Sequence, residues 1–524
     1  MDAQLYATLN KGWKSTCRVL FGKEIGELEK YEEWLGEYLP PVAKRRSHLS
    51  GKKVIVAKDS YPKNARFISE DELTTNRSYT LSINDIKDVD SIMRALCEKC
   101  EYTGNRFLGN SAHMSESDIV LDSQYVHNST NIEQSTYIYS SYMMRRGSKY
   151  SYGSGWTAAG EFTVRCVAGI NLRRCLESHA VADCSDTYFS FDCHGCTDIL
   201  FSFGQRSKNH MIGNLPLAKE KYAQIKAKLL GEIAAELESK KCFPPLFALV
   251  PKMPPKNLPK ITPSLPKDEK SMAAIEKGFS STYGVILKSK PFSICDYEEW
   301  LEKNTVRVVP VQSAFGNTTY LPQNFPVFSL LPKHRLISVF ESIEAGKSLH
   351  VREQSLSSLP SLLKELGNIA FFTAEFYNGE NRNIISAPHV LHSANVYKGY
   401  EATYSEHSGC TSLSLHSKYV YGCHRIIDSQ FSLKCYNSLY LNRCLELDGC
   451  TKCADSYFCH NCEGMSDSMF CFNAKGKRFS IGNTDLQREK YAQVKEMLLS
   501  QMAGELDKNK SLKWDIYNIG AKNS

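Results

Sequence analysis

The chain has 524 residues, of which 42% are hydrophobic and 23% charged, a composition that is ordinary for a globular protein and excludes wholesale disorder. The net charge of +7 is spread over the whole length, so it forms no dense basic patch of the kind that a dedicated nucleic-acid binder carries. No run approaches the roughly 18 apolar residues of a membrane span, and the first residues, MDAQLYATLNKGWKSTC, lack a signal core, so we expect a cytoplasmic protein.

Residues 1–109 are predicted to form an N-terminal helical or mixed cap. Two apolar stripes within it have the spacing of amphipathic helices. The first stripe contains Leu28, Tyr31, Leu35 and Leu39, and the second contains Ile86, Val89, Met93 and Leu96. We expect such helices to cover the strands that follow, because uncovered strand edges pair with other chains. Alternatively, one helix face also contacts a neighbouring subunit.

Residues 110–214 carry a regular repeat in which cysteines stand nine residues apart, separated by short alternating pieces rich in aromatic residues. These cysteines are Cys166, Cys175, Cys184 and Cys193. Nine residues make about two and a half helical turns, which would place successive cysteines on opposite faces of a helix. Stacked strands fit better. We predict a parallel β-solenoid with about 18 residues per coil, and a mainly β fold with α-helical caps.

Residues 215–241 are predicted to form a capping helix, because their apolar residues follow a helical stripe. The stripe consists of Ile225, Leu229, Leu230, Ile233 and Leu237. Residues 242–269 hold eight of the 19 prolines, a density that favours an extended, semi-rigid linker.

The remainder of the chain repeats this layout. Residues 440–506 match residues 171–237 at a constant offset of 269 (440 − 171), and the N-terminal parts match at an offset of 266, which places Trp34 on Trp300. The chain is therefore a tandem duplication, with copy 1 at residues 1–241 and copy 2 at residues 270–510. In copy 2 we predict a cap at 270–384, a second β-solenoid at 385–483 and a capping helix at 484–510, followed by a tail at 511–524.

The 19 cysteines are expected to be thiols, as in a reducing compartment. They include four CxxC pairs: Cys97 and Cys100, Cys193 and Cys196, Cys450 and Cys453, and Cys459 and Cys462. Two such pairs brought together would make a tetrahedral zinc site, so these residues are the best metal candidates. The pairs are not shared between the copies, however, since Cys196 matches Met465 and Cys450 matches Val181. We therefore expect stacked structural cysteines and no cofactor, with zinc as the alternative.

Two carboxylates in each copy offer a second hypothesis, because Asp186 and Asp198 match Asp455 and Asp467. Solenoid enzymes that act on polysaccharides cluster carboxylates on one face, where an acid and a base flank the same bond. Twelve residues is not a whole coil of the predicted length, so the two carboxylates need not share a face. We expect them to lie in turns and assign no catalytic residue.

Histidines and cations give weaker signals. His194, His460, His407 and His416 have no histidine at the matching position of the other copy, so we interpret each as an internally satisfied histidine. Arg206 and Lys208, which match Lys475 and Lys477, lie near the start of a predicted helix, where an anion can bind.

The C-terminal end of each predicted solenoid resembles a known group of proteins. The run from Cys196 to Asn214, CTDILFSFGQRSKNHMIGN, and the following Lys-Glu-Lys-Tyr are similar to the cysteine-rich repeats of uncharacterised proteins from small-genome archaea and candidate-phylum bacteria. Those repeats end in a motif of the type FGCxxLxxKxYxIxN followed by KEEY. Here Gln205 and Ala474 replace the motif cysteine in both copies, and the stretch from Phe203 to Asn214 is shorter. The resemblance implies a cytoplasmic prokaryotic protein and no particular activity.

These observations favour a non-enzymatic structural or interaction protein that assembles with copies of itself. Coil packing and capping explain nearly every residue that the copies share, which leaves few residues for a catalytic site. The alternatives are a zinc- or redox-active cysteine-rich protein and, third, a solenoid-type carbohydrate-active enzyme. Neither a membrane span nor a nucleic-acid partner is expected.

Overall fold

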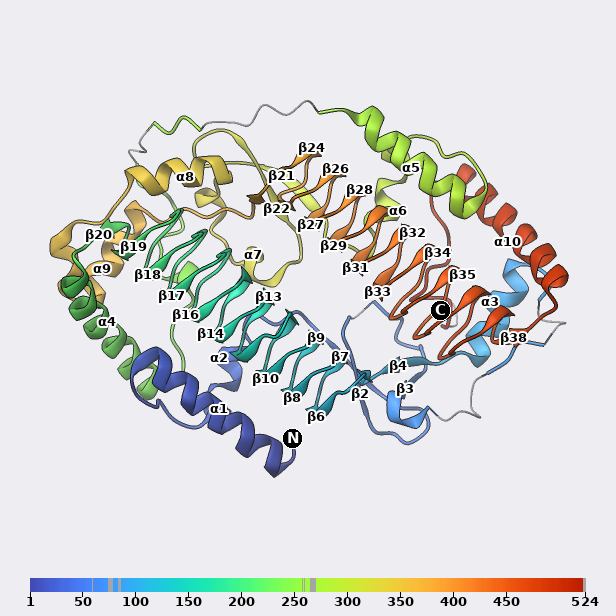
Figure 1. Ribbon diagram of the computed structural model, residues 1–524, viewed down its shortest axis with the longest axis horizontal. Helices are drawn as coiled ribbons and strands as arrows, with labels where there is room; N and C mark the ends of the chain where they lie inside the picture. Colours follow the sequence, from blue (N-terminus) through green and yellow to red (C-terminus); the bar gives the residue numbers. More distant parts are fainter. Residues whose placement is uncertain are drawn as a thin grey trace.

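A computed structural model describes the whole chain except residues 59, 74–78, 83–85, 257, 259, 264–269 and 522–524. Parts of the predicted linker and of the predicted C-terminal tail thus lie outside the described residues. Figure 1 shows two stacks of strands side by side, each flanked by helices on its outer face. The helices are α1 Ala3–Phe21, α2 Glu32–Gly36, α3 Val89–Lys99, α4 Lys219–Lys240, α5 Met272–Leu287, α6 Glu298–Glu302, α7 Pro326–Ser329, α8 Val339–Ser348, α9 Leu359–Glu365 and α10 Arg488–Asn509.

Each copy contains a ten-stranded sheet, here called the outer sheet, and a six-stranded sheet, the inner sheet. The outer sheet of copy 1 comprises β6 Ala112–Ser115, β8 Gln124–His127, β10 Thr136–Tyr139, β12 Lys149–Tyr152, β14 Glu161–Val164, β16 Arg173–Leu176, β17 Ser185–Tyr188, β18 Thr197–Leu200, β19 Asn209–Ile212 and β20 Leu215–Pro216. Its inner sheet comprises β5 Phe107–Leu108, β7 Asp118–Leu121, β9 Thr130–Glu133, β11 Tyr142–Arg145, β13 Gly155–Ala158 and β15 Val167–Ile170.

Copy 2 has the same arrangement. Its outer sheet comprises β24 Arg382–Ile385, β26 Ala394–Tyr397, β28 Glu406–Gly409, β30 Lys418–Tyr421, β32 Gln430–Leu433, β34 Asn442–Leu445, β35 Ala454–Tyr457, β36 Ser466–Met469, β37 Arg478–Ile481 and β38 Thr484–Asp485. Its inner sheet comprises β23 Phe376–Asn378, β25 His389–Leu391, β27 Tyr400–Thr403, β29 Ser412–Leu415, β31 His424–Ile427 and β33 Tyr436–Leu439. Three strand pairs lie outside these sheets: β1 Ala43–Arg46 with β2 Lys53–Val56, β3 Phe67–Ser69 with β4 Tyr102–Gly104, and β21 Val308–Gln312 with β22 Thr318–Pro322.

The chain alternates between the two sheets of a copy and returns to the same sheet at a regular interval. Gln124 pairs in parallel with Thr136, and Arg173 pairs with Ser185. The same interval of 12 residues separates Ser123 from Ser135, whose amide donates to the Ser123 hydroxyl. One step in copy 1 is longer, because Thr136 pairs with Lys149. The predicted coil of about 18 residues, which assumed that nine residues make half a coil, is therefore wrong.

The interior explains the error. Every third residue points inward, so one return of the chain has four inward positions. Two residues separated by any multiple of three positions therefore both point inward. The cysteine spacing of nine residues is such a multiple, but it is not the structural repeat. The residue before each inward position has a positive φ, as at Ile119 (φ 55°) and Asp122 (φ 48°). These left-handed residues turn the chain tightly enough to close a short loop.

Small polar side chains at the inward positions repeat one hydrogen-bond pattern. The Ser117 hydroxyl donates to the Ser115 carbonyl (2.9 Å) and accepts from the Ser129 amide (3.1 Å), one return further on. The Cys423 thiol does the same with the Tyr421 carbonyl (3.4 Å) and the Cys435 amide (3.4 Å). Serine and cysteine therefore alternate freely at these positions, because each is small and can both donate and accept.

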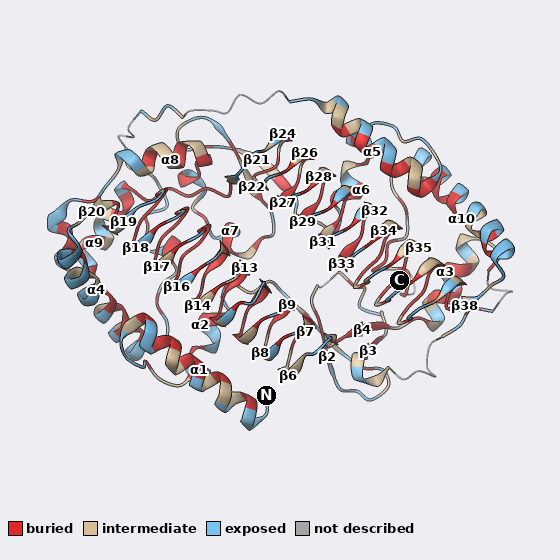
Figure 2. Ribbon diagram, viewed as in Figure 1, coloured by how far each residue is buried: buried red, intermediate tan, exposed pale blue. Residues whose placement is uncertain are grey.

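Long helices line the outer sheets, so the fold is mixed α/β rather than mainly β. Helix α1 packs along β8, β10, β12, β14 and β16, while α4 packs on β19 and on α1. In copy 2, α5 packs along the outer sheet and α10 packs on β37 and on α5. Helices α4 and α10 lie within residues 215–241 and 484–510, respectively. Figure 2 shows that these helices are buried on the side facing the strands and exposed on the other side.

A glycine sets how closely α1 approaches the outer sheet. A Cβ atom at Gly12 would lie 2.6 Å from the Tyr152 hydroxyl, and one at Gly278 in α5 would lie 2.4 Å from the Tyr421 hydroxyl. We expect Gly12→Val to lower the free energy of unfolding by about 2–3 kcal/mol in urea titrations, because it overpacks this contact. The control is Gly231→Ala in α4, where a Cβ meets nothing within 4 Å and which should raise stability by about 0.5–1 kcal/mol. Equal effects of both changes would contradict the packing argument.

The end of each copy is covered by a segment of the other copy. In copy 1, the Gly213 carbonyl accepts from the Val351 amide (2.9 Å), and Asn214 donates to the Leu349 carbonyl (3.0 Å). In copy 2, the Gly482 carbonyl accepts from the Leu81 amide (2.9 Å). Because Gly213 matches Gly482, Leu81 and Val351 occupy equivalent places. We call these segments, residues 79–82 with 86–104 and residues 339–351, the crossed caps.

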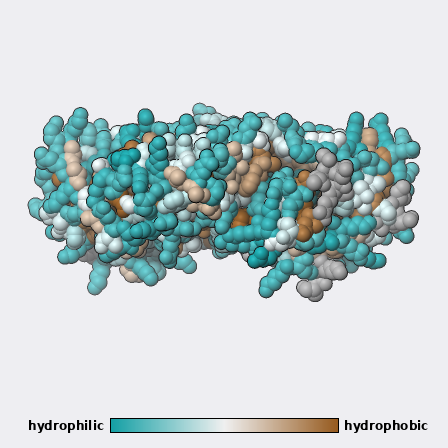
Figure 3. Space-filling view, turned by 90° about the horizontal axis from the view of Figure 1, so that it is seen from below, coloured by the Kyte–Doolittle hydropathy of each residue, from teal (hydrophilic) through white to brown (hydrophobic). Residues whose placement is uncertain are grey.

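The two inner sheets face each other across the middle of the molecule (Figure 1). Trp156 on β13 packs edge-on against Tyr400 on β27 at 5.5 Å between ring centroids, and Arg425 on β31 lies 3.6 Å from Glu133 on β9. Seen from below in Figure 3, the molecule is flattened, and its surface is mainly hydrophilic with separate hydrophobic patches. Among the described residues, none of the helices combines the length and the apolar character needed to cross a bilayer.

Candidate functional site

The cysteines proposed as metal ligands lie in two settings. Cys193, Cys196, Cys450, Cys453, Cys459 and Cys462 are buried at inward positions, and Cys97 and Cys100 lie at the end of α3. None of the eight forms a disulfide with another described residue. Each of the six inward thiols donates to a backbone carbonyl two residues earlier, as Cys462 does to His460 (3.3 Å). The Cys97 thiol donates to the Ala521 carbonyl (3.1 Å). Within the described part of the chain, no group of three or more histidine, cysteine or acidic side chains is placed to hold a metal ion.

The pKa is lowered for three of the inward thiols, Cys196, Cys453 and Cys462, in each case with hydrogen bonds from neighbouring thiols as a cause. A hydrogen bond from Cys184 lowers the pKa of Cys196 to about 7. Burial would raise the pKa of Cys462, but hydrogen bonds from Cys450 and Cys459 lower it to about 7. Their burial at 0% and 2% exposure separates both sulfurs from solvent, and thiols reactive toward external reagents need access.

The shared hydrogen-bond pattern predicts how these positions tolerate change. Cys423→Ser should alter the free energy of unfolding by less than about 1 kcal/mol, because serine makes the same two bonds at inward positions throughout both copies. Cys423→Leu should cost about 1–3 kcal/mol, because the interior has no room for it. Chemical denaturation of the two variants measures the difference. A serine variant as unstable as the leucine variant would contradict this account.

The paired carboxylates are closer than the sequence argument allowed. Because the structural repeat is 12 residues, Asp186 and Asp198 lie on neighbouring strands of the outer sheet, where Ser185 pairs with Thr197. Lys226 of α4 lies 3.9 Å from Asp186 and 3.0 Å from Asp198, and Arg174 pairs with Asp186 at 2.5 Å. Asp455 and Asp467 repeat this arrangement in copy 2 with Arg443 (2.6 Å) and Lys495 (3.6 Å). All four carboxylates lie in strands, so the expectation that they lie in turns is wrong. Cations pair with them and tie α4 and α10 to the sheets.

Each of the four histidines lies near a carboxylate or an aromatic ring, but the buried Nδ1 of His407 has no hydrogen-bond partner among the described residues. His460 is fully buried, with Nδ1 3.0 Å from Asp448 and Nε2 accepting from the Thr103 amide (3.1 Å). His194 lies 3.2 Å from Asp192, and His407 stacks on Tyr419. His416 lies 3.5 Å from Asp428.

Three of the four cations of the suggested anion site also have internal partners. Arg206 pairs with Asp192 (2.9 Å), Lys475 with Glu463 (3.2 Å) and Lys477 with Asp485 (2.9 Å). These carboxylates satisfy the charges that a bound anion would need.

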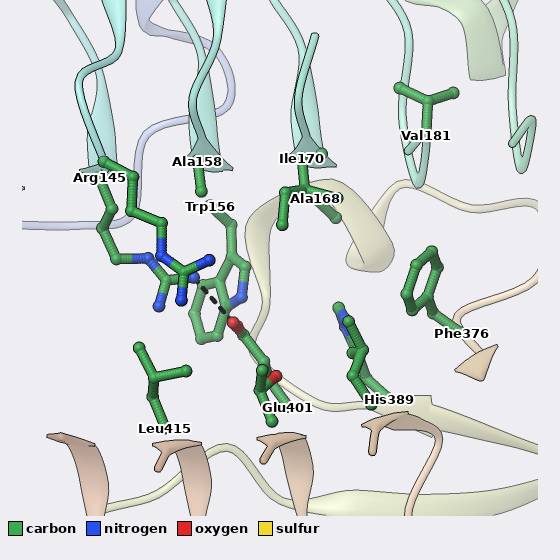
Figure 4. Close-up of a pocket in the computed structure, with 14 residues that line it drawn as sticks. Arg145, Trp156, Ala158, Ala168, Ile170, Val181, Phe376, His389, Glu401 and Leu415 are labelled. Carbon is green, nitrogen blue, oxygen red and sulfur yellow. Dashed lines mark hydrogen bonds and ion pairs between the residues drawn. The ribbon is translucent and has the colours of Figure 1, made fainter. Parts of the chain in front are cut away.

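A polar junction that the sequence did not indicate lies between the inner sheets. Figure 4 shows Arg145 of copy 1 reaching Glu401 of copy 2, beside Trp156 and His389. The Arg145–Glu401 ion pair measures 2.7 Å and is more than nine-tenths buried. Burial raises the pKa of Glu401 and lowers that of His389 to about 3. The cavity beside them has a volume of about 50 Å³, enough for a few water molecules.

No signal in the sequence pointed to this junction, because its residues come from both copies and are not duplicated. Arg145 matches Leu415, and Glu401 matches Asn131, so a comparison of the copies with each other passes over all of them.

The chain was also compared with known proteins. No protein-family model matches it, and neither the curated proteins nor the solved structures gave a match.

Proposed function

We propose that the chain is a non-enzymatic scaffold or interaction protein built from two parallel β-solenoids, in the cytoplasm of a prokaryote. The observation that carries this proposal is how the interior is used. Small polar side chains and thiols at the inward positions donate to the carbonyl two residues before and accept from the amide 12 residues on. A parallel stack of this kind is rigid and extends its surface at a fixed spacing of about 4.8 Å per coil.

The two ends of the copy 1 outer sheet differ, because one is covered and the other has a free strand edge, and this difference supports self-association. Its last strands are followed by the antiparallel β20 and covered by a crossed cap, whereas β6 pairs with β8 alone among the described strands. A strand with one free edge is a template for pairing with another chain. We therefore propose that two molecules join by antiparallel pairing of their β6 strands around a two-fold axis.

The first test is the mass of the purified protein in solution, measured by size-exclusion chromatography with light scattering. We expect a dimer or a larger assembly. His113 is exposed on β6, and His113→Lys should shift the mass toward that of a monomer, because facing lysines on an edge strand oppose pairing. The control His416→Lys places the same charge on an exposed histidine of copy 2 and should leave the mass unchanged. A monomer at every concentration would contradict self-association.

A further inference from the structure

A second cavity lies between the two copies and shares Trp156 with the junction in Figure 4. Its volume is about 320 Å³, within the lower part of the range found for small-molecule sites. Copy 1 contributes inner-sheet residues and the chain after β2, and copy 2 contributes inner-sheet residues and two loops. The side chains that carry the argument are Lys58, Asn131, Tyr142, Trp156, His424 and Asn437.

Several residues that line this cavity have a polar atom without a hydrogen-bond partner within the described part of the chain. They are Asn131 Oδ1, the Tyr142 hydroxyl, Trp156 Nε1 and Asn437 Oδ1. All four side chains are more than nine-tenths buried, with exposures of 4–8%. A buried polar group without a partner costs about 1–3 kcal/mol, so four of them around one cavity indicate that something else supplies the partners.

A buried cation lies in the same wall. The Lys58 ammonium donates to the Asn304 carbonyl (2.6 Å) and lies over the rings of Tyr436 (5.5 Å) and Tyr517 (5.3 Å). No ion pair joins it to a carboxylate of the described residues. Burial lowers the pKa of Lys58 to about 8, so the amine remains largely charged at neutral pH. Asp448, Asp515 and Glu446 attract this charge without pairing with it directly, and each is paired with another cation or histidine. An anionic group in the cavity would form a direct ion pair with Lys58.

Comparison of the copies shows that the fold does not require these polar residues. Asn437 matches Ala168 and His424 matches Gly155, at the same places in the inner sheets. Ala168 and Asn437 both have a positive φ (60° and 49°), so alanine satisfies this backbone position equally well. Lys58 matches Asn324 in the same way. Asn131, by contrast, matches the polar Glu401 of the junction in Figure 4, and Asn324 lines the same cavity as Lys58. The equivalent places thus carry different residues, which suits a ligand site better than a packing requirement.

We propose that this cavity binds a small aromatic carboxylate that also carries an amino or hydroxyl group. The carboxylate would pair with Lys58, and the amino or hydroxyl group would donate to the free amide oxygens of Asn131 and Asn437. Trp156 and Phe325, whose ring centroids are 4.7 Å apart, provide an aromatic wall for a planar ring. The inference is independent of the proposed scaffold function.

The test is isothermal titration calorimetry of the full chain with 4-aminobenzoate, 4-hydroxybenzoate and L-tyrosine. At least one of these should bind with a stoichiometry of one and quench Trp156 fluorescence, a signal that Trp156→Phe removes. Asn437→Ala imports the residue that copy 1 already uses and should fold normally, and it should weaken binding at least tenfold. Lys58→Met should do the same, whereas Asn442→Ala, on the outer sheet, should bind like the unmodified protein.

Comparison ligands separate the parts of the proposal. Benzoate, which lacks a donor group, and aniline, which lacks a carboxylate, should each bind at least tenfold more weakly than 4-aminobenzoate. The inference is overturned if none of the three probes binds with a stoichiometry of one. It is equally overturned if binding is unchanged in both Asn437→Ala and Lys58→Met, or if inorganic phosphate binds better than all three probes.

Discussion

Asp448→Ala should lower the free energy of unfolding by about 3–5 kcal/mol, because it leaves buried donors without their acceptor and removes one of the two carboxylates beside the buried Arg106, the other being Asp118. Asp448 is fully buried and lies 3.6 Å from Arg106 and 3.0 Å from His460. It also accepts hydrogen bonds from Tyr517 (3.1 Å) and Asn437 (3.1 Å). These partners come from copy 1, copy 2 and the C-terminal segment, so a single carboxylate joins three parts of the chain. Urea titration followed by circular dichroism measures the loss.

The matched control is Asp455→Ala. Asp455 also pairs with an arginine, Arg443, but both side chains are partly exposed, at 27% and 40%. Removing a pair in solvent should cost about 0–1 kcal/mol. If the two alanine variants lost the same stability, burial would not be the reason for the importance of Asp448.

Glu177→Gln should cost about 3 kcal/mol at neutral pH by the same reasoning, and this loss should shrink in acid. Glu177 pairs with the fully buried Arg165 (2.7 Å) and accepts from the Leu246 amide (3.0 Å). Burial would raise the pKa of Glu177, but the Arg165 charge and the hydrogen bond with His179 outweigh it and lower the pKa to about 2.

The sign of the pH effect follows from that shift. An unfolded glutamate titrates near 4.3 and the folded Glu177 near 2, so its contribution is complete above about pH 5. It is lost as the pH falls from about 5 to 2. The difference in unfolding free energy between the unmodified protein and Glu177→Gln should therefore be constant from pH 5 to 7 and approach zero near pH 2. The control Glu161→Gln breaks an exposed pair with Arg173 and should change stability by about 0–1 kcal/mol at every pH.

Much of the architecture could be predicted from internal comparison of the sequence. The duplication, parallel strands and the helices α4 and α10 all follow from residues that the copies share. The length of the repeat could not be predicted in this way, because cysteine, serine and threonine are equivalent at inward positions. These residue types show only that a position points inward. Intervals of 9 and 12 residues therefore look alike in the sequence, although only an interval of 12 residues brings a strand back beside its neighbour.

The candidate sites could not be predicted for a related reason. Comparison of the two copies points only to residues that they share, so residues present in one copy, such as the unmatched histidines, carry no signal. Lys58, Glu401, His424 and Asn437 are all of this kind, and they meet because the inner sheets of the two copies face each other. No local pattern marks such residues before the relative placement of the copies is known.

The crossed caps also fix the order in which the chain becomes complete during synthesis. The last strands of copy 1 end at Gly213, but the amide that closes them belongs to Val351, which leaves the ribosome much later. At about 5–20 residues per second, that end stays open for roughly 7–28 s. The segment around Leu81 is made long before Gly482, so its contact with Gly482 can form only after almost the whole chain has been synthesised. Neither half therefore reaches its final form alone, and a nascent chain that carried only one half could close itself only by borrowing a segment from another molecule.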